Sequence, residues 1–349
     1  MRIAVDCRYL GRSGIGRVTQ GILEHLDERH EYVLIGSPSA LKGYPAAEIV
    51  EDETSPFSVR GMLRFPALHG CDALIVPNFI IPFGVKVPVF SVMHDLIFLD
   101  LPKIATRGVF DRIVKRYFLS RCMKKSRRVL CVSEFTRQRA AHYFPKQSTK
   151  CYVAYNGLSE RLLSFPVDGN KREKTLVYVG NIKPHKGLKT LLDAFRMLPE
   201  GYTLEIIGEK DGFLTGVKEG ELDFSQPGIT FTGRLPEEDL YKAIASASFL
   251  VQPSYYEGVG LPPLEALCLG TKPILSDIPV FREIYSAEQA EFFRVGDAES
   301  LCACILHADP VVADRRHALA ERFSFAAFTQ KLLREVEACC SPSGKGENA

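Results

Sequence analysis

The sequence has no tryptophan and no Cys-x-x-Cys pair, and it lacks both a P-loop and a His-Glu-x-x-His motif. These absences remove the usual signatures of P-loop nucleotide hydrolases and of a large class of zinc peptidases. Ten cysteines are present. Without a metal-binding pattern, we expect them to be reduced thiols, most of them buried.

Long hydrophobic runs are also missing. The most apolar stretch, Ala73–Met93, is interrupted by residues that a membrane-spanning helix tolerates poorly, namely Pro77, Asn78, Pro82, Lys86 and Pro88. We therefore expect two buried strands flanking a loop there. Because Arg2–Asp6 already has the pattern of a strand, no space is left for a secretory signal, and we expect a cytoplasmic protein.

Charge is distributed unevenly along the 349 residues. The net charge is +2, but residues 1–165 carry 24 basic and 15 acidic side chains, whereas the remainder carries 20 and 27. Nine basic side chains and a single acid, Asp111, lie between Arg107 and Arg128. This segment is either a solvated helix face or a peripheral contact with the anionic inner face of a membrane. Nucleic acid is disfavoured because no recognition module accompanies the segment. The acidic run Glu51–Glu53 is expected to be solvated.

Short apolar strands alternate with amphipathic helices, which predicts an α/β protein with doubly wound parallel sheets. The expected strands of the first half are Arg2–Asp6, Tyr32–Gly36, Ala73–Val76, Val89–Met93, Arg128–Val132 and Tyr152–Ala154. Those of the second half are Thr175–Val179, Thr203–Ile207, Ile229–Phe231, Phe249–Gln252 and Pro273–Leu275. The chain is long enough for two domains, each with its own core.

The polar stretch Ser164–Lys174 has the composition of a linker. It predicts a first Rossmann-like domain over residues 1–165 and a second over 166–324. A last helix, in residues 325–340, is expected to pack back on the first domain. Loops at the carboxyl ends of the strands in the two domains are then expected to face each other across a cleft, where ligands of doubly wound sheets bind.

The strongest local signal is Ser254–Ala266, which lies between a buried strand and a helix that starts at Pro262. Gly258 and Gly260 allow backbone amides to approach a ligand closely, and the helix start supplies partial positive charge for a phosphate. Two carboxylates, Glu257 and Glu265, flank the loop and are suitable acceptors for sugar hydroxyls. A plain glycine turn before a capped helix is the alternative.

Two glutamates eight residues apart around a Gly-x-Gly-Leu-Pro loop resemble the signature of family four retaining glycosyltransferases. The resemblance extends over nearly the whole chain and implies the GT-B fold, with an acceptor domain followed by a donor domain. It implies that Glu257 contacts the donor sugar and that Glu265 holds the ribose of the nucleotide. The backbone amides of Gly258, Val259, Gly260 and Leu261 would bind the sugar and the diphosphate.

A second signal is the strand-to-helix turn Val179–Gly187, in which Lys186 lies at the helix start. Departure of a nucleoside diphosphate leaves negative charge on its phosphates, and a cation at this turn stabilises that charge as it forms. A typical family member has an arginine after the glycine, where this chain has Asn181, so the second cation is in doubt. Lys183 is placed to reach the same oxygens. Lys186 as a plain surface lysine is the alternative.

Gly14 and Gly16 lie in a glycine-rich segment, Gly11–Val18, that follows the first strand. A dinucleotide-binding fingerprint needs a third glycine at position 19, where this chain has a threonine, and an acid after the second strand. The match is better to the family's glycine loop over diphosphate and acceptor. Arg17 then contacts an anionic acceptor or the phosphates, or it serves only the helix start.

Residues in three further segments resemble functional positions of the family. His94 follows the strand Val89–Met93, where relatives place a histidine near the hydroxyls of the donor sugar; a buried core histidine is the alternative. Arg234 and Leu235 precede a helix where relatives contact the base. Ser133 resembles the family's strand-to-helix turn, although an ordinary helix cap explains it as well.

The resemblance implies a retaining hexosyltransferase that uses a nucleotide-sugar co-substrate and no other cofactor. Asp-x-Asp, the metal-binding motif of the other main glycosyltransferase architecture, is absent, so we expect no metal. The turn around Lys186 and the short chain favour GDP-mannose as donor, while a UDP- or ADP-sugar stays open. We expect the acceptor to be a hydroxyl of a lipid-linked glycan. The alternatives are a sugar-binding protein without catalysis, a phosphorylase or epimerase on the same scaffold, and a nicotinamide-dependent oxidoreductase.

Overall fold

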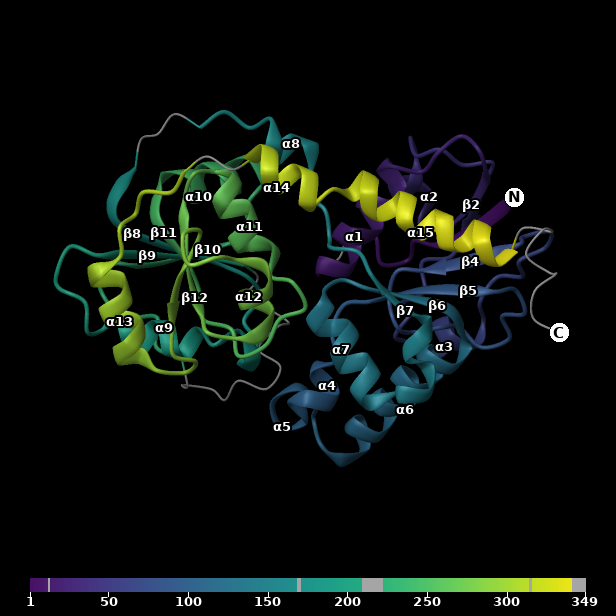
Figure 1. The fold of residues 1–349 in the computed structure, drawn as a ribbon, viewed down its shortest axis with the longest axis horizontal. Coiled ribbons are helices and arrows are strands. Elements are labelled where there is room, and N and C mark those ends of the chain that lie inside the picture. Colours follow the sequence, from purple (N-terminus) through teal and green to yellow (C-terminus); the bar gives the residue numbers. More distant parts are fainter. Residues whose placement is uncertain (12, 168–170, 209–221, 314–315, 341–349) are drawn as a thin grey trace. The chain divides into compact units, whose positions relative to one another are not determined.

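The computed structural model describes residues 1–340 except 12, 168–170, 209–221 and 314–315. They form two compact units (Figure 1). Unit 1 contains residues 1–99, 109–157 and those from 323 onward, and unit 2 contains residues 100–108 and 158–322. Each unit is built on one parallel sheet with helices on both faces, which confirms the predicted pair of doubly wound domains.

Unit 1 has a seven-stranded sheet in the order β3-β2-β1-β4-β5-β6-β7. Its strands are β1 (Arg2–Asp6), β2 (Glu31–Gly36), β3 (Glu48–Glu51), β4 (Ala73–Val76), β5 (Val89–Met93), β6 (Ser126–Cys131) and β7 (Cys151–Val153). Its helices are α1 (Ser13–Glu24), α2 (Pro38–Leu41), α3 (Val59–Leu63), α4 (Ile97–Asp100, whose last residue groups with unit 2), α6 (Val109–Lys125), α7 (Glu134–Tyr143), η1 (Pro145–Lys150) and α15 (Phe325–Cys340). Helices α1 and α15 lie over one face of the sheet, and α6 and α7 over the other (Figure 1).

Unit 2 has a six-stranded parallel sheet in the order β10-β9-β8-β11-β12-β13. Its strands are β8 (Arg172–Val179), β9 (Thr203–Ile207), β10 (Ile229–Gly233), β11 (Ala247–Gln252), β12 (Lys272–Ser276) and β13 (Glu291–Phe293). Its helices are α5 (Pro102–Ala105), α8 (Glu160–Leu163), η2 (Pro184–Lys186), α9 (Leu188–Phe195), α10 (Glu237–Ser246), α11 (Leu261–Cys268), α12 (Pro279–Ile284), α13 (Ala298–His307) and α14 (Arg316–Arg322).

Four inner strands, two in each sheet, are buried from end to end. All residues of β4, β5, β11 and β12 are buried, as expected for parallel strands that are covered by helices on both sides. The continuous apolar runs of these strands made them easy to predict. Two edge strands, β3 and β13, were not predicted, because β3 is mostly exposed and β13 has only three residues.

The boundaries between the units differ from the predicted ones. Residues 100–108 group with unit 2 although they lie within the predicted first domain. The main passage to unit 2 follows Gly157, and the return to unit 1 follows Arg322. Helix α15 belongs to unit 1, where it packs against α1. His30 Nε2 lies 2.9 Å from Glu337 Oε1 and fixes the outer part of α15.

The prediction that the acidic run Glu51–Glu53 is solvated was wrong for its central residue. Asp52 Oδ2 accepts a hydrogen bond of 3.2 Å from Nη1 of Arg8, whose side chain is fully buried. The same guanidinium binds both carboxylate oxygens of Asp6, each at 2.8 Å. The run therefore supplies one member of a buried charge network.

Two predictions about cysteines and membrane spans can be compared with the structure. All ten cysteines are free, and half of them are buried. Among the helices of the described residues, none is both long enough and apolar enough to cross a membrane.

Candidate functional site

The Lys186 turn follows β8 at the carboxyl edge of the second sheet. Pro184, His185 and Lys186 form η2, and Gly187 turns the chain into α9. Gly187 has a φ of +67°, and a Cβ at this position would lie 1.9 Å from the carbonyl oxygen of Pro253. Only glycine fits this conformation and this close approach. It allows the turn to lie directly against the segment that follows β11.

Glu257 is carried by that segment and forms an ion pair with Lys186. Lys186 Nζ lies 2.7 Å from Oε1 and 2.9 Å from Oε2 of Glu257. Ser254 Oγ donates a 2.7 Å hydrogen bond to Oε1, and Gln252 Nε2 donates a longer one of 3.3 Å. The side chain of Glu257 is 10% exposed and that of Lys186 22% exposed. The pair is thus held from within the unit while part of it is open to a ligand.

The loop from Gly258 to Leu261 connects this carboxylate to helix α11. Gly260 has a φ of +79°, and its carbonyl oxygen accepts a 2.9 Å hydrogen bond from the buried hydroxyl of Tyr285. A Cβ on Gly260 would come within 2.6 Å of the Phe281 ring, so a side chain is excluded here. Helix α11 begins at Leu261, directly after this turn. The loop therefore packs against Phe281 of α12 and is hydrogen-bonded to Tyr285, the residue that follows this helix.

Glu265 lies on the second turn of α11 and is 4% exposed. Val259 is also buried, whereas Gly258 and Leu261 are half-buried. The two ends of the loop are thus partly accessible, and the side chain of Val259 lies in the core. This arrangement is suited to binding through backbone amides near a helix N-terminus.

Burial and the charged pair shape the titration of three neighbouring side chains. Burial, assisted by the charge of Glu257, raises the pKa of the Tyr178 and Tyr285 hydroxyls. Burial lowers the pKa of His185 to about 3, and the charges of Lys186 and Lys183 act in the same direction. His185 is therefore neutral at physiological pH, and the cations of this turn are the two lysines.

The remaining residues predicted for the donor lie at the same sheet edge of unit 2. Asn181 and Lys183 are half-buried between β8 and η2, and the backbone carbonyl of Asn181 accepts a 3.4 Å hydrogen bond from Tyr178. Arg234 is exposed and Leu235 half-buried in the turn between β10 and α10. Among the predicted residues of unit 2, Lys186 and Glu257 are in direct side-chain contact.

The predicted residues of unit 1 lie at the carboxyl edge of its own sheet. Gly14, Gly16 and Arg17 are in the first turns of α1. A Cβ on Gly16 would lie 2.6 Å from the carbonyl oxygen of Tyr9, so this glycine has a packing role whatever it binds. Gly14 is exposed and has open space around it.

His94 follows β5 and is fixed by one hydrogen bond. Its Nε2 lies 2.8 Å from the carbonyl oxygen of Pro77. Because a carbonyl only accepts, Nε2 carries the proton, and in the neutral ring Nδ1 is the acceptor. Burial lowers the pKa of His94, which favours this neutral form. Ser133 caps α7 by accepting a 3.1 Å hydrogen bond from Thr136 N, so the ordinary cap accounts for it.

Sequence reasoning missed the residues that hold the pair in place. Gln252, Ser254 and Ser276 are fully buried, and Ser276 Oγ donates to the backbone carbonyls of Gln252 and Ser254. Ser254 was inside the predicted segment, but nothing in a single sequence distinguishes a serine that binds a carboxylate from one that caps a turn. Tyr285 lies 25 residues from its partner Gly260, so no local pattern indicates it.

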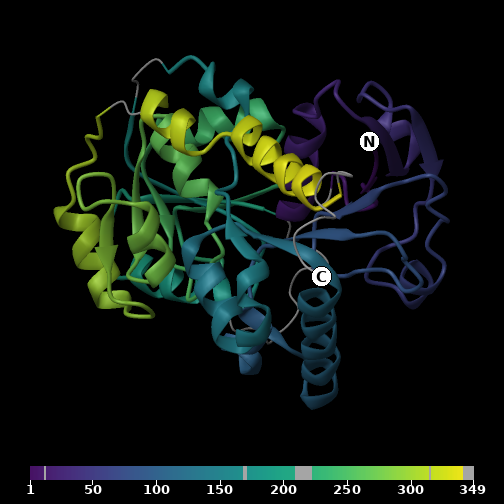
Figure 2. The ribbon, with the colours of Figure 1, turned by 45° about the vertical axis from the view of Figure 1, so that its right-hand side comes forward.

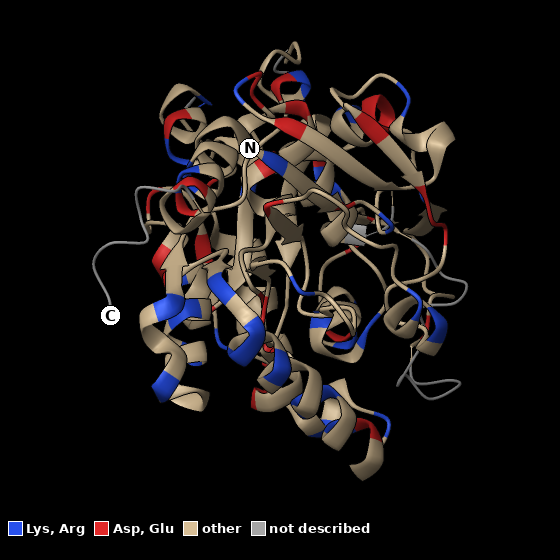
Figure 3. Ribbon diagram, turned by 90° about the vertical axis from the view of Figure 1, so that its right-hand side faces the viewer, with Lys and Arg blue, Asp and Glu red and all other residues tan. Residues whose placement is uncertain are grey.

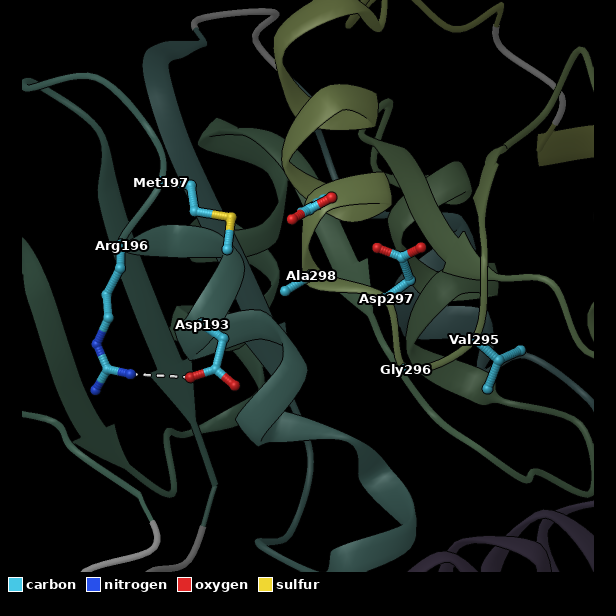
Figure 4. A pocket seen from close by; sticks show the side chains of 8 residues that line it. Asp193, Arg196, Met197, Val295, Gly296, Asp297 and Ala298 are labelled. Atoms are coloured by element: carbon cyan, nitrogen blue, oxygen red, sulfur yellow. Dashed lines mark hydrogen bonds and ion pairs between the residues drawn. The ribbon is translucent and has the colours of Figure 1, made fainter.

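Unit 2 also has a cavity of about 670 Å³ between α9 and α13 (Figure 4). It is lined by Asp193, Arg196, Met197, Val295, Gly296, Asp297, Ala298 and Glu299, none of which was predicted from the sequence. Its charged groups serve internal contacts: Asp193 pairs with Arg196 at 2.9 Å, and Asp297 caps α13. Within the described ranges, no group of three or more His, Cys, Asp or Glu side chains is placed to hold a metal ion.

Comparison with known proteins shows what this chain is similar to. Residues 161–308 match the family model described as glycosyl transferases group 1. The O-antigen chain mannosyltransferase RfbU of Salmonella typhimurium is 26% identical over 215 residues, which cover 59% of this chain and 60% of that protein. The O-antigen chain mannosyltransferase B of Escherichia coli is 26% identical over 60% of this chain and 58% of that protein. The chain thus spans about three fifths of the length of these curated relatives.

Solved structures show the same fold over nearly the full chain. HepE of Anabaena, in complex with UDP-glucose, has a TM-score of 0.74 at 16% identity and covers 97% of this chain and 100% of its own. Sucrose-phosphate synthase of Thermosynechococcus elongatus has a TM-score of 0.74 at 17% identity with the same coverage. The predicted GT-B fold and the predicted resemblance to glycosyltransferases are therefore confirmed.

Proposed function

Because residues 161–308 match the group 1 glycosyl transferases, we propose that this protein transfers a hexose, with retention, from a nucleotide diphosphate donor to a hydroxyl group of a lipid-linked glycan. The observation that carries the proposal is the ion pair between Lys186 and Glu257 at the carboxyl edge of the second sheet. A cation for the leaving group and a carboxylate for the sugar are combined there in one partly open position.

The chemistry follows from the hydrogen-bonding capacity of the pair. A lysine ammonium has three N–H donors, and two acceptor oxygens of Glu257 occupy positions around Nζ. A phosphate oxygen that approaches Lys186 from the open side takes up the remaining capacity. Lys186 then stabilises the negative charge that develops on the diphosphate in the transition state, and Glu257 accepts hydrogen bonds from sugar hydroxyls.

The proposed transfer balances without a nucleophilic side chain. The bond between the anomeric carbon and the diphosphate oxygen breaks, and its electron pair stays on the diphosphate. The acceptor oxygen forms the new bond to the anomeric carbon on the same face. Its proton passes to the departing diphosphate oxygen. Glu265 holds the ribose, and the amides of the Gly258–Leu261 loop bind the diphosphate in this scheme.

GDP-mannose is the donor that we propose. Two bacterial relatives of this chain are named mannosyltransferases, which supports the sugar. The solved structure with UDP-glucose is only 16% identical to this chain, so it supports the fold but does not identify the base of the donor nucleotide. We further propose that neither a metal nor another cofactor takes part, that the basic segment Arg107–Arg128 contacts a membrane from the cytoplasmic side, and that the acceptor is presented there.

The donor test compares thermal unfolding of the full chain with GDP, UDP and ADP at equal concentrations. A ligand at about 100 times its Kd stabilises the folded state by about 2.7 kcal/mol, and we expect the largest rise in Tm with GDP. A larger rise with UDP or ADP would change the donor, and no rise with any of them would contradict the proposal.

A turnover assay with GDP-mannose and a lipid-linked saccharide tests the reaction itself. We expect a product with the same anomeric configuration as the donor by NMR. The rate should be unchanged by EDTA. An inverted product or a rate that EDTA abolishes would contradict retention or metal independence, respectively.

A further inference from the structure

Helix α6 of unit 1 has an exposed apolar face. Val109, Phe110, Ile113 and Tyr117 are 76%, 81%, 60% and 53% exposed. The last three are spaced three and four residues apart, so they form one stripe on a helix. Exposed apolar residues scattered singly need no explanation, but a contiguous stripe of this kind marks an interaction surface.

The helix is anchored to unit 1 chiefly through its second half, and in its first half Lys115 Nζ lies 4.2 Å from the centre of the Phe98 ring. Leu119, Cys122 and Met123 are its buried residues. Arg121 donates hydrogen bonds to the carbonyl oxygens of Ile81 at 2.8 Å and Pro82 at 3.1 Å. The first turns bury no side chain completely, and in Figure 2 the blue-teal helix stands out from the sheet of its unit.

The charges beside the stripe are of one sign. Arg112, Arg116, Lys124 and Lys125 are exposed. Asp111, the single acid between residues 107 and 128, is half-buried and pairs with Lys115 at 2.9 Å. Figure 3 shows lysine and arginine recurring along the helices at the foot of the view. The exposed part of α6 is therefore apolar and cationic.

We propose that this face of α6 inserts shallowly into an anionic lipid bilayer, with Phe110, Ile113 and Tyr117 at the boundary of headgroups and acyl chains. The neighbouring cations then meet lipid phosphates, because anionic surfaces attract basic segments while apolar side chains gain from leaving water. A purely solvated helix face accounts for the cations but leaves the apolar stripe exposed. The inference deepens the membrane contact of the proposed function by naming the side chains that insert.

The occupant is committed to lipid on two grounds. The stripe lies on a helix that stands out from the sheet of its unit (Figure 2). The exposed charges around it are all positive over residues 109–128, which fits a surface of anionic phosphates. A protein partner for this face is an outcome that the test below detects.

Co-sedimentation with lipid vesicles tests the proposal without any turnover. The full chain is mixed with vesicles of phosphatidylcholine alone or with phosphatidylglycerol added, and we expect strong binding only to the second kind. Replacing Phe110, Ile113 and Tyr117 together by serine should weaken binding by at least about tenfold. The matched control is Val311→Ser, which removes an apolar side chain that is 73% exposed in unit 2 and should leave binding unchanged.

Charge variants separate the two contributions. Arg112→Gln with Arg116→Gln should weaken binding about fivefold for each lost charge and should flatten its dependence on salt. The serine variant should keep that salt dependence. Arg161→Gln with Arg294→Gln, two exposed arginines of unit 2, controls for net charge.

Three outcomes would overturn the inference. The first is wild-type binding that is equal on both vesicle types, and the second is absence of binding. The third is a loss of binding in the Val311 control, or in the Arg161 and Arg294 control, that is as large as the loss in the matching α6 variant. Self-association of the wild type that the serine variant abolishes would assign the face to a protein partner instead. The Tm rise with GDP, measured on each variant, verifies folding and separates failure of this inference from failure of the proposed donor site.

Discussion

Both sheets of this protein have an acid–base pair at the carboxyl end of a strand, but the two pairs are exposed to different extents. In unit 1, Arg8 and Asp6 lie 2.8 Å apart and both side chains are fully buried. In unit 2, Lys186 and Glu257 lie 2.7 Å apart with 22% and 10% of their side chains exposed. The same kind of contact is thus closed to solvent in the Arg8–Asp6 pair and partly open to solvent in the Lys186–Glu257 pair.

The surroundings explain the difference. Arg8 also binds Asp52 and, at 2.9 Å, the carbonyl oxygen of Gly61, so it ties β1 to the segment that leads into α3. Lys186 has no comparable set of backbone acceptors in the described structure, and its hydrogen bonds go to Glu257. A pair whose cation is saturated by protein stabilises a loop, whereas a pair whose cation is partly open is available to an anionic ligand.

The largest expected effect concerns the closed pair. Arg8→Leu leaves Asp6 and Asp52 without their common cation, and loss of one partner of a buried pair costs about 3 to 5 kcal/mol. We expect the urea midpoint to fall accordingly, while Lys186→Ala shifts it little. Equal effects of the two substitutions on unfolding would remove the distinction between a closed and an open pair.

The open pair should show the opposite profile. Lys186→Ala should lose about 2 to 4 kcal/mol of transition-state stabilisation, a hundredfold or more in turnover, with the fold intact. Lys189→Ala is the matched control, because Lys189 is an exposed lysine of α9 that pairs with Asp193 of the same helix. Turnover of the Lys186 variant within a few fold of wild type would remove this lysine from the mechanism.

His185 sharpens the comparison through pH. Its folded pKa is lowered to about 3, whereas the unfolded value is about 6.5. As pH falls below about 6.5 the unfolded chain takes up a proton that the folded chain does not, so stability declines by about 1.4 kcal/mol per pH unit down to about pH 3. His185→Gln should remove about 2 kcal/mol of the stability difference between pH 7 and pH 5.

The control for this effect is His317→Gln, whose side chain is almost fully exposed. It should leave the pH dependence of unfolding in urea unchanged. If the stability of the His185 variant depends on pH as that of the wild type does, the outcome contradicts the lowered pKa that we attribute to burial next to two lysines.

The sequence predicted those parts of the molecule that depend on local pattern. Continuous apolar runs such as Val89–Met93 identified the buried strands, and the glycine-flanked turns identified Lys186 and Glu257 as candidates. The contact between these two side chains, 71 residues apart, follows from the adjacency of β8 and β11 in the sheet. That adjacency is a property of the fold and has no local signal.

Other features were beyond sequence reasoning for the same reason. Asp52 was predicted to be solvated because its partner, Arg8, lies 44 residues earlier in the chain. The apolar stripe on α6 was overlooked because basic residues dominate the composition of that segment. Only the burial of Leu119, Cys122 and Met123 shows which side of the helix faces the protein and which is left exposed.

The smallest expected effect tests how the open pair is held. Ser254→Ala removes the 2.7 Å hydrogen bond to Oε1 of Glu257, while Lys186 and Gln252 remain as donors. Hydrogen bonds to charged groups contribute about 1.5 to 3 kcal/mol, and with two donors left we expect kcat to fall by about tenfold. KM for the donor and the affinity for the free nucleotide should change little, because Ser254 positions the carboxylate and is itself fully buried.

Ser276→Ala is the control, since Ser276 binds backbone carbonyls next to Glu257 but not its carboxylate. An equal loss of kcat in both variants would assign the effect to packing under the loop, and the open pair would then not depend on Ser254 for its orientation.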